Sequence, residues 1–178
     1  MREVHMKINS VSIRKMQHND YEIMSQWLST KEVLEFYGDV NAPFTLQQVI
    51  DKYEPRVNGE IAVVPYIVEL DDEPIGFMQR YLINDEQKET LGYPVNFIIF
   101  GIDQFIGYPE LFNKGVGTRM IKLFIEDIAR DKEINRIILD PAVANLRAIR
   151  AYEKCGFQKV KKINEDTCWM MEYTIDRS

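Results

Sequence analysis

The segment over residues 113–157 constrains the fold of this chain more than any other part, because three local patterns follow one another in it. A glycine pair, Gly115 and Gly117, opens a helix whose apolar side chains recur on one face. A short apolar strand follows at residues 134–140, and a second helix is predicted over residues 145–154. Helices with one apolar face need a sheet to pack against, so this segment indicates a protein that mixes helices and strands.

The other predicted elements follow from apolar alternation, capping residues and turn residues. We expect strands at residues 10–16, 61–70, 75–83, 96–103, 157–163 and 168–175, and helices from Asn19 or Asp20 through Leu28, from Thr45 through residue 57, and over residues 115–131. Pro55 should end or bend its helix, Pro65 should mark an edge strand or a bulge, and Gly101 should mark a bulge. Residues 84–94 should form a polar loop. The order indicates a mixed central sheet with helices on both faces, in the α/β (α+β) class.

Length and composition indicate a single domain over residues 1–178. No apolar run reaches the roughly 20 residues that cross a bilayer, and the N-terminus lacks the apolar core of a signal peptide, so we expect a cytoplasmic protein without membrane contact. The net charge is -6, which argues against a nucleic-acid partner and is compatible with a cationic one. Two histidines and two cysteines are too few for a His-based metal site or a disulfide framework.

The glycine pair lies where a helix N-terminus is expected, and such a place suits an anion. Unpaired backbone N–H groups and the helix dipole favour negative charge there, and glycines let the backbone approach a pyrophosphate closely. The spacing matches neither a Walker loop nor the dinucleotide-binding fingerprint. By itself, the pair could equally form a tight turn, so the residues downstream must decide.

The downstream block NLRAIRAYEKCGF, at residues 145–157, resembles the GNAT superfamily of acyl-CoA transferases when it is taken together with the glycine pair. The resemblance implies the GNAT fold, with acetyl-CoA as cosubstrate, no metal, and the pantetheine arm between two splayed parallel strands at residues 96–103 and 135–140. Contacts to the cofactor are then expected from Asn113, Lys114, Gly115, Val116, Gly117, Thr118, Asn145 and Tyr152. Phe112 departs from the Gln or Arg of the family pattern, so one side-chain contact is missing or replaced.

Acyl transfer to an amine needs a group that takes a proton and one that gives a proton. An alkyl amine has a pKa near 10.4 and is protonated at neutral pH, so its proton must leave as it approaches the thioester. Asp103, at the end of its predicted strand, suits this role as base, and the resemblance makes Tyr152 the acid for the departing thiolate. Asp103 could instead cap a turn, and Tyr152 could simply pack against Phe157.

Further segments resemble one branch of the superfamily, the aminoglycoside 6′-N-acetyltransferases. These are Trp27-Leu28, Val33 to Gly38, Glu73 to Gln79, Gly101 to Gln104 and Asp140-Pro141, and the likeness runs over about residues 10–175. It implies acetylation of the 6′-amine of a polycationic aminoglycoside by direct attack in a ternary complex, which gives antibiotic resistance. By this resemblance Asp103 and Asp140 bind substrate amines and Tyr37 faces the sugar rings. The acidic side chains Glu86 and Glu89 could line the same pocket or be solvated.

Simpler interpretations stay open for several of these residues. Asp140 could be a turn residue before Pro141, Tyr37 could close a helix end, and Trp27 is expected in the core. Cys155 has no histidine near it in sequence, so we do not expect an acyl-enzyme route.

Two other functions are also open at this point. One is a related enzyme that acylates a hydroxylysine-like amine in siderophore biosynthesis, and the other is a non-catalytic module that binds acyl-CoA. The retention of both Asp103 and Tyr152 speaks against the second. The protein could be a monomer or a homodimer.

Overall fold

The computed structural model describes residues 10–177, and most of the N-terminal segment examined for a signal peptide lies outside them. The strands are β1 (Val11–Lys15), β2 (Val63–Leu70), β3 (Glu73–Leu82), β4 (Ile98–Ile106), β5 (Ile134–Leu139), β6 (Gln158–Ile163) and β7 (Cys168–Thr174). The α-helices are α1 (Tyr21–Trp27), α2 (Lys31–Tyr37), α3 (Leu46–Val57), α4 (Asp85–Leu91), α5 (Val116–Ala129) and α6 (Leu146–Lys154), with short 3-10 turns η2 (His18–Asp20) and η3 (Pro109–Leu111). The expected α/β class with a mixed sheet is confirmed.

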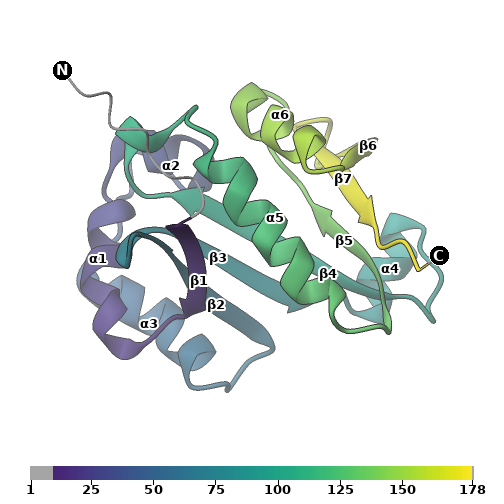
Figure 1. Ribbon diagram of the computed structural model, residues 1–178, viewed down its shortest axis with the longest axis horizontal. Coiled ribbons are helices and arrows are strands. Elements are labelled where there is room, and N and C mark those ends of the chain that lie inside the picture. Colours follow the sequence, from purple (N-terminus) through teal and green to yellow (C-terminus); the bar gives the residue numbers. More distant parts are fainter. Residues whose placement is uncertain (1–9, 178) are drawn as a thin grey trace.

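The strands form one twisted sheet in the order β1-β2-β3-β4-β5-β7-β6 (Figure 1). The first four strands are antiparallel neighbours, and β2 joins β3 through a two-residue turn. Asp71 and Asp72 in that turn have φ values of 51° and 65°, which is the left-handed backbone that a tight hairpin requires. Strands β4 and β5 run parallel, with α5 as the crossover between them.

Strands β4 and β5 separate before β4 ends. Their pairing runs from Ile98 to Gly101 on β4, and Gly101 opposite Ile138 is the last pair. Beyond this point β3 still pairs with β4 as far as Ile106, whereas β5 pairs with β7. The side of β4 that faces β5 is therefore open over residues 102–106, and the expected pair of splayed parallel strands is confirmed.

Side chains alternate between two cores on opposite faces of the sheet, as the pleat of a strand requires. Val68 and Met78 pack in the core under α5 and α6, whereas their neighbours Ile67 and Phe77 pack in the core that contains α1, α2 and α3. Figure 1 shows α5 running across the near face of the sheet, whereas α1 and α3 are grouped together away from α5 and pack on the opposite face. Trp27 is 1% exposed and belongs to the second core, as expected.

Two helices were not predicted. Residues 84–94 were expected to be a polar loop, but α4 occupies residues 85–91, because Asn84 and Gln87 form a reciprocal capping box at its start. Helix α2 begins after Thr30, and Val33 and Leu34 bury its inner face. Both helices have only seven residues, so tertiary packing and caps stabilise them more than helix propensity does.

The structure corrects expectations about proline and glycine. Of the two effects expected of Pro55, an end or a bend of its helix, the end is wrong, because α3 continues to Val57. Pro65 lies in β2, which has neighbours on both sides, and the irregularity of β2 is at Val68/Glu69 instead. The Pro65 carbonyl accepts a hydrogen bond from Met16 just past the end of β1, so the missing N–H falls where that pairing stops. Gly101 pairs regularly, and its lack of a side chain makes room for the Tyr81 ring.

The predicted cap at Asn19 or Asp20 is also corrected. Asp20 precedes α1 but does not cap it with its side chain. Its carboxylate instead accepts two hydrogen bonds of 2.8 Å from the Arg14 guanidinium and one from the Gln17 backbone N–H. Asp20 is 5% exposed, so this ion pair satisfies a buried charge.

Candidate active site

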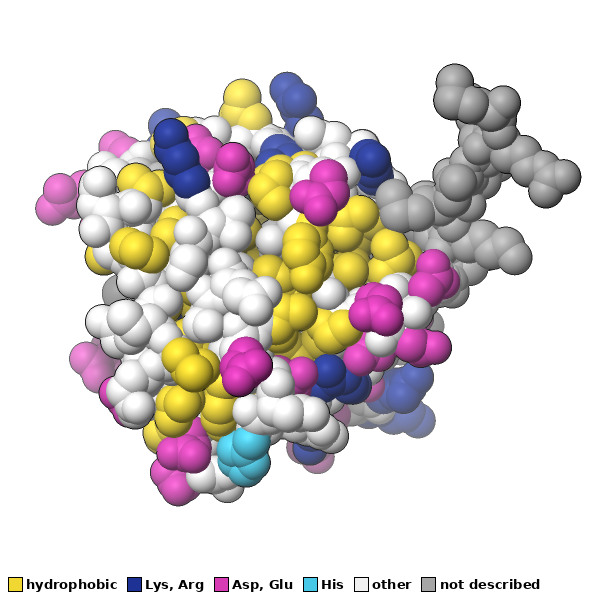
Figure 2. All heavy atoms as spheres, turned by 90° about the vertical axis from the view of Figure 1, so that its left-hand side faces the viewer, with side chains coloured by type: hydrophobic (Ala, Val, Ile, Leu, Met, Phe, Trp, Pro, Cys, Tyr) yellow, Lys and Arg dark blue, Asp and Glu magenta, His cyan; other side chains and the backbone are white. Residues whose placement is uncertain are grey.

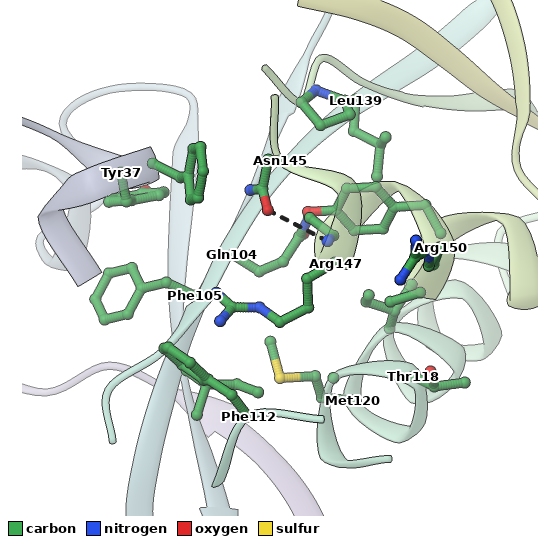
Figure 3. A pocket seen from close by; sticks show the side chains of 18 of the residues that line it. Tyr37, Gln104, Phe105, Phe112, Thr118, Met120, Leu139, Asn145, Arg147 and Arg150 are labelled. Carbon is green, nitrogen blue, oxygen red and sulfur yellow. Dashed lines mark hydrogen bonds between the residues drawn. The ribbon is translucent and has the colours of Figure 1, made fainter. Parts of the chain in front are cut away.

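A cavity of about 420 Å³ lies in the opening between β4 and β5, with α2, α5 and α6 around it (Figure 3). The predicted site residues that line it are Tyr37, Asp103, Asn113, Gly115, Gly117, Thr118, Asp140, Asn145 and Tyr152. These residues come from five separate segments of the chain, so the fold brings together what the sequence keeps apart. Lys114 is exposed beside the cavity, and the Val116 side chain is buried in the core.

The N-terminus of α5 opens onto this cavity. Gly115 has a φ of 81° and Asn113 a φ of 59°, so the chain turns sharply before it enters the helix. No side chain caps this end of α5 and its first turn carries no acidic residue. A helix end of this kind suits an anion, and it lies where the glycine pair predicted a helix N-terminus.

Asn145 begins α6 on the other side of the opening. Its side-chain oxygen accepts a hydrogen bond of 3.3 Å from the backbone N–H of Ala148, which is drawn as a dashed line in Figure 3. Gly156, with a φ of 103°, follows the end of the helix. Between them, Arg147 lies with its guanidinium carbon 3.6 Å from the centre of the Phe112 ring, which brings a cation to the place where Phe112 departs from the family pattern.

Asp103 lies within β4, three residues before its end, and not at the end as expected. One carboxylate oxygen accepts a hydrogen bond of 2.6 Å from the Gln79 side-chain amide on β3. Burial raises the pKa of Asp103, and the Gln79 hydrogen bond and the nearby cations Arg56 and Lys52 oppose that rise. A carboxyl group with a raised pKa that faces a cavity is suited to accept a proton near neutral pH.

Asp140 is the first residue after β5 and faces Asp103 across the opening. Burial and the charge of Asp103 raise the pKa of Asp140 to about 6. Its side chain is nevertheless open to solvent through the cavity. Two carboxylates that repel each other in one opening favour the binding of a cation between them.

The Tyr152 hydroxyl is held from one side by Gln104. The Gln104 side-chain amide donates a hydrogen bond of 2.6 Å to the Tyr152 oxygen, and both residues line the cavity. Burial raises the pKa of Tyr152 to about 12, although the Gln104 hydrogen bond lowers it. The expected packing of Tyr152 on Phe157 is present too, edge to face at 6.0 Å. Because the hydroxyl oxygen accepts from Gln104, its own proton is free for another acceptor.

Tyr37 ends α2 and lines the cavity, and it also packs against the second core. Its ring centre lies 4.7 Å from that of Phe105 and 6.0 Å from that of Phe77. Burial raises the pKa of Tyr37 well above its usual value. Both interpretations of this residue, a cavity wall and a packed helix end, therefore describe its position.

The two glutamates of α4 lie apart from this cavity. Glu86 lines a second cavity of about 420 Å³ between α4 and the β6–β7 connection, and Asp140 lines this cavity as well as the first. Glu89 is exposed and lines neither cavity. Among residues 10–177, no three His, Cys, Asp or Glu side chains converge as a metal site, and no helix there is long and apolar enough to cross a membrane.

Sequence reasoning did not single out Gln79 or Gln104 as site residues. Each donates a hydrogen bond to one of the two predicted reactive side chains, Asp103 and Tyr152. The available signal for Gln79 was its place in the apolar segment 75–83, where a polar residue needs a partner. Gln104 directly follows Asp103 and gave no such signal.

Comparison with known proteins places the chain in a family. Residues 17–165 match the family model of the acetyltransferase (GNAT) domain. The chain is 34% identical over 151 residues to the aminoglycoside N(6′)-acetyltransferase type 1 of Klebsiella pneumoniae and of Serratia marcescens, and the match covers 85% of this chain and 75% of each relative.

Solved structures agree with this match. Aminoglycoside acetyltransferase AAC(6′)-Ib in complex with coenzyme A has a TM-score of 0.77 and 33% identity, over 93% of this chain and 95% of that one. The same enzyme in complex with ribostamycin and coenzyme A has a TM-score of 0.78 and 33% identity, over 93% of each chain. The chain belongs to the GNAT acetyltransferase family. Within that family, the relatives described here are aminoglycoside 6′-N-acetyltransferases.

Proposed function

We propose that this protein transfers the acetyl group of acetyl-CoA to the 6′-amine of aminoglycoside antibiotics and so gives resistance to them. The observation that carries the proposal is the opening between β4 and β5, which joins a helix N-terminus suited to a pyrophosphate with two carboxylates suited to a cationic amine. The similarity to aminoglycoside 6′-N-acetyltransferases over 85% of the chain supports the same substrate class.

Asp103 acts as the base in this proposal. The amine arrives protonated, the anionic carboxylate attracts it, and Asp103 takes its proton, directly or through water, as the nitrogen attacks the thioester carbonyl. Attack forms the amide bond and the carbon–sulfur bond then breaks, so coenzyme A leaves as a thiolate. No residue of the protein is acylated, because both substrates occupy the opening together. Cys155 supports this route, since its pKa is raised by burial and its sulfur lies 3.5 Å from the Thr118 carbonyl oxygen.

Tyr152 acts as the acid that protonates this thiolate. The Tyr152 oxygen accepts a hydrogen bond from Gln104, so its own proton stays available for the cofactor. A raised pKa in the free protein keeps the proton on the tyrosine, so Tyr152 is in its protonated form when the thiolate leaves. Asn113 to Thr118 and Asn145 bind the cofactor on either side of this position.

The aminoglycoside extends over both cavities in this proposal. Asp140 lines both, so it binds an amino group where they meet, and Glu86 offers a further carboxylate in the second cavity. Tyr37 presents its ring to the sugar next to the reacting amine. Glu89, which lines neither cavity, contributes through its charge at most.

The proposal is tested by measuring thiol release from acetyl-CoA with a panel of aminoglycosides. Kanamycin and tobramycin carry a 6′-amine and should react, whereas analogues with a hydroxyl at the 6′ carbon should not. Equal rates with both groups would rule out the 6′ position. Thermal shift with N6-hydroxylysine in place of the antibiotics tests the siderophore alternative, which requires that this amine stabilises the protein and aminoglycosides do not.

A further inference from the structure

A polar chain of three side chains runs beneath Asp103, on the side away from the cavity. Arg56 of α3 donates a hydrogen bond of 2.6 Å from Nη1 to the Gln79 side-chain oxygen, and Gln79 in turn donates one of 2.6 Å from Nε2 to the Asp103 carboxylate. Gln79 is 7% exposed, and Arg56 does not line the cavity. The chain therefore reaches Asp103 through the protein and not through the substrate site.

The chemistry of arginine decides the orientation of the amide between them. A guanidinium has only donors, so the Gln79 atom that faces Arg56 must be the oxygen. The Gln79 NH₂ group must then face Asp103, where it donates to an anionic carboxylate and satisfies it. Without Arg56, the amide could turn and present its oxygen to Asp103, which a carboxylate disfavours.

We propose that Arg56 is a positioning residue that acts through Gln79 to hold Asp103 as the proton-accepting carboxylate. The proposal rests on the assignment of Asp103 as the base. In this role Arg56 does not touch the substrate, but its charge sets the pH range in which Asp103 acts as the base. A cation is needed there because burial of Asp103 opposes its ionised form.

Several other titratable or charged groups also face Asp103. They are Tyr37 on α2, Lys52 and Tyr53 on α3, Tyr81 on β3, Asp140 after β5 and Tyr152 on α6. The tyrosines stay neutral because their pKa values are raised, and Asp140 repels Asp103. Lys52 is the other cation, but it lies exposed at the surface and has no hydrogen bond to Gln79 or Asp103, whereas Arg56 is joined to Asp103 by two short ones.

The test is the pH dependence of kcat/KM for Arg56→Met, with one aminoglycoside throughout so that the titration of its amine is common to all variants. Loss of the cation raises the pKa of Asp103, so the acid limb should move to higher pH by about half a unit to one unit, with roughly three- to tenfold lower activity below the limb and near wild-type activity at pH 9. If Arg56 only stabilised the fold, Arg56→Met would instead lower kcat/KM by the same factor at every pH.

Three further variants make the result decisive. Arg56→Lys keeps a cation with donors only, so its acid limb should lie close to the wild-type pH. Gln79→Leu removes the donor to Asp103, so its acid limb should move to higher pH at least as far as that of Arg56→Met. Arg80→Met is the matched control, because Arg80 is next to Gln79 but faces the opposite side of β3, where it pairs with Asp127 at 3.8 Å. Its limb should stay at the wild-type position, and the affinity for coenzyme A should be unchanged in all variants.

The possible failures can be told apart with Asp103→Asn. If Asp103→Asn retains wild-type turnover, the base assignment itself is wrong and the role of Arg56 falls with it. If Asp103→Asn is inactive while the acid limb of folded Arg56→Met and Gln79→Leu stays in place, Asp103 is the base and the positioning role of Arg56 is refuted.

Discussion

Asp103 and Tyr152 lie in the same opening, and each is held by a glutamine of the sheet. Gln79 donates to the carboxylate and Gln104 donates to the hydroxyl, so both reactive side chains keep the form that their proposed role needs. Asp103 can accept a proton and Tyr152 can give one. Hydrogen bonds of this kind orient each group, and together with burial and nearby charges they set its pKa.

The role of Tyr152 leads to a prediction for Tyr152→Phe. The variant lacks the proton donor, but water can reach the thiolate, so kcat should fall by about tenfold while KM for both substrates stays near the wild-type value. Steady-state kinetics with both substrates checks this. Tyr173→Phe is a matched control, because Tyr173 packs on the same Phe157 ring, at 5.7 Å, but lies outside the cavity. Wild-type kcat in Tyr152→Phe would remove its role as acid.

The raised pKa of Asp140 predicts a conflict between stability and function. Its folded-state pKa, about 6, lies above the usual value of 3.8, so the ionised carboxylate opposes folding fully above pH 6, and the penalty disappears as the pH falls toward 4. Asp140→Asn should therefore raise the free energy of unfolding at pH 7.5 by about 1 kcal/mol, which corresponds to a rise of roughly 2–4 °C in the melting temperature. The gain is no larger than this, because solvent in the cavity screens the charge. The gain should vanish near pH 4.

The same substitution should weaken substrate binding. Asp140→Asn loses the carboxylate shared by both cavities, so KM for kanamycin should rise at pH 7.5 while KM for acetyl-CoA is unchanged. Thermal unfolding at pH 7.5 and pH 4, together with steady-state kinetics, measures both effects. A variant with lower stability at pH 7.5 would contradict the electrostatic penalty.

At the scale of elements, the N-terminus of α5 is built by two glycines with different tasks. Gly115 has a φ of 81° and lies before the helix, whereas Gly117 is inside it, and a Cβ at Gly117 would meet only Ile106 at an ordinary 3.7 Å. The first glycine is therefore required by the backbone. The backbone does not require the second, and we propose that it leaves space for the cofactor.

This difference predicts opposite effects of alanine at the two positions. Gly115→Ala should lower the free energy of unfolding by about 1 kcal/mol, because alanine disfavours the left-handed backbone, and should weaken the binding of coenzyme A by displacing the loop. Gly117→Ala should leave the free energy of unfolding equal or raise it by up to about 1 kcal/mol, because alanine favours the helix. Urea unfolding of both variants compares them directly, and equal losses would show that Gly117 also has a backbone task.

For the whole molecule, charge is the property that matters most to the proposed substrate. The chain carries a net charge of -6, and Figure 2 shows acidic side chains spread around a hydrophobic area on the face formed by α1, α2 and α3. An anionic protein attracts a polycation over a distance of about 10 Å at 0.1 M salt and about 30 Å at 0.01 M salt. Attraction of this range adds to the contacts in the cavities.

Salt should therefore affect the two substrates differently. KM for an aminoglycoside should rise several-fold between low salt and about 0.5 M NaCl, because salt screens its attraction to the protein. KM for acetyl-CoA, which is itself an anion, should not rise in parallel. Steady-state kinetics at several salt concentrations tests this, and a KM for aminoglycoside that is independent of salt would contradict a binding site formed mainly by carboxylates.

The sequence was sufficient for the motifs that act locally. The helix that follows the glycine pair and the helix over residues 145–154 were predicted from near neighbours in the sequence, and the structure has both. The capping box of Asn84 and Gln87 was also present in the sequence, but the polar composition of that segment concealed it. A seven-residue helix is too short for an apolar period to be visible.

Residues that act at long range could not be predicted in this way. Arg56 and Gln79 lie 23 positions apart, and Gln79 and Asp103 lie 24 apart, so no local pattern joins them. In the sequence, Arg56 looks like any cation in the last turn of an exposed helix. Only the packing of α3 against β2 brings it under β3 and next to the amide of Gln79.

The sequence by itself determined the order of the strands, the ends of α5 and α6, the acidic charge and the types of side chain available for acyl transfer. These are set by steric limits and hydrogen bonds between near neighbours in the chain. The tertiary structure decided where β4 and β5 part, because their pairing ends at Gly101 and Ile138 while β4 stays paired with β3 as far as Ile106 and β5 stays paired with β7. That divergence opens the cavity and brings carboxylates, glutamines and a tyrosine from distant segments into one site.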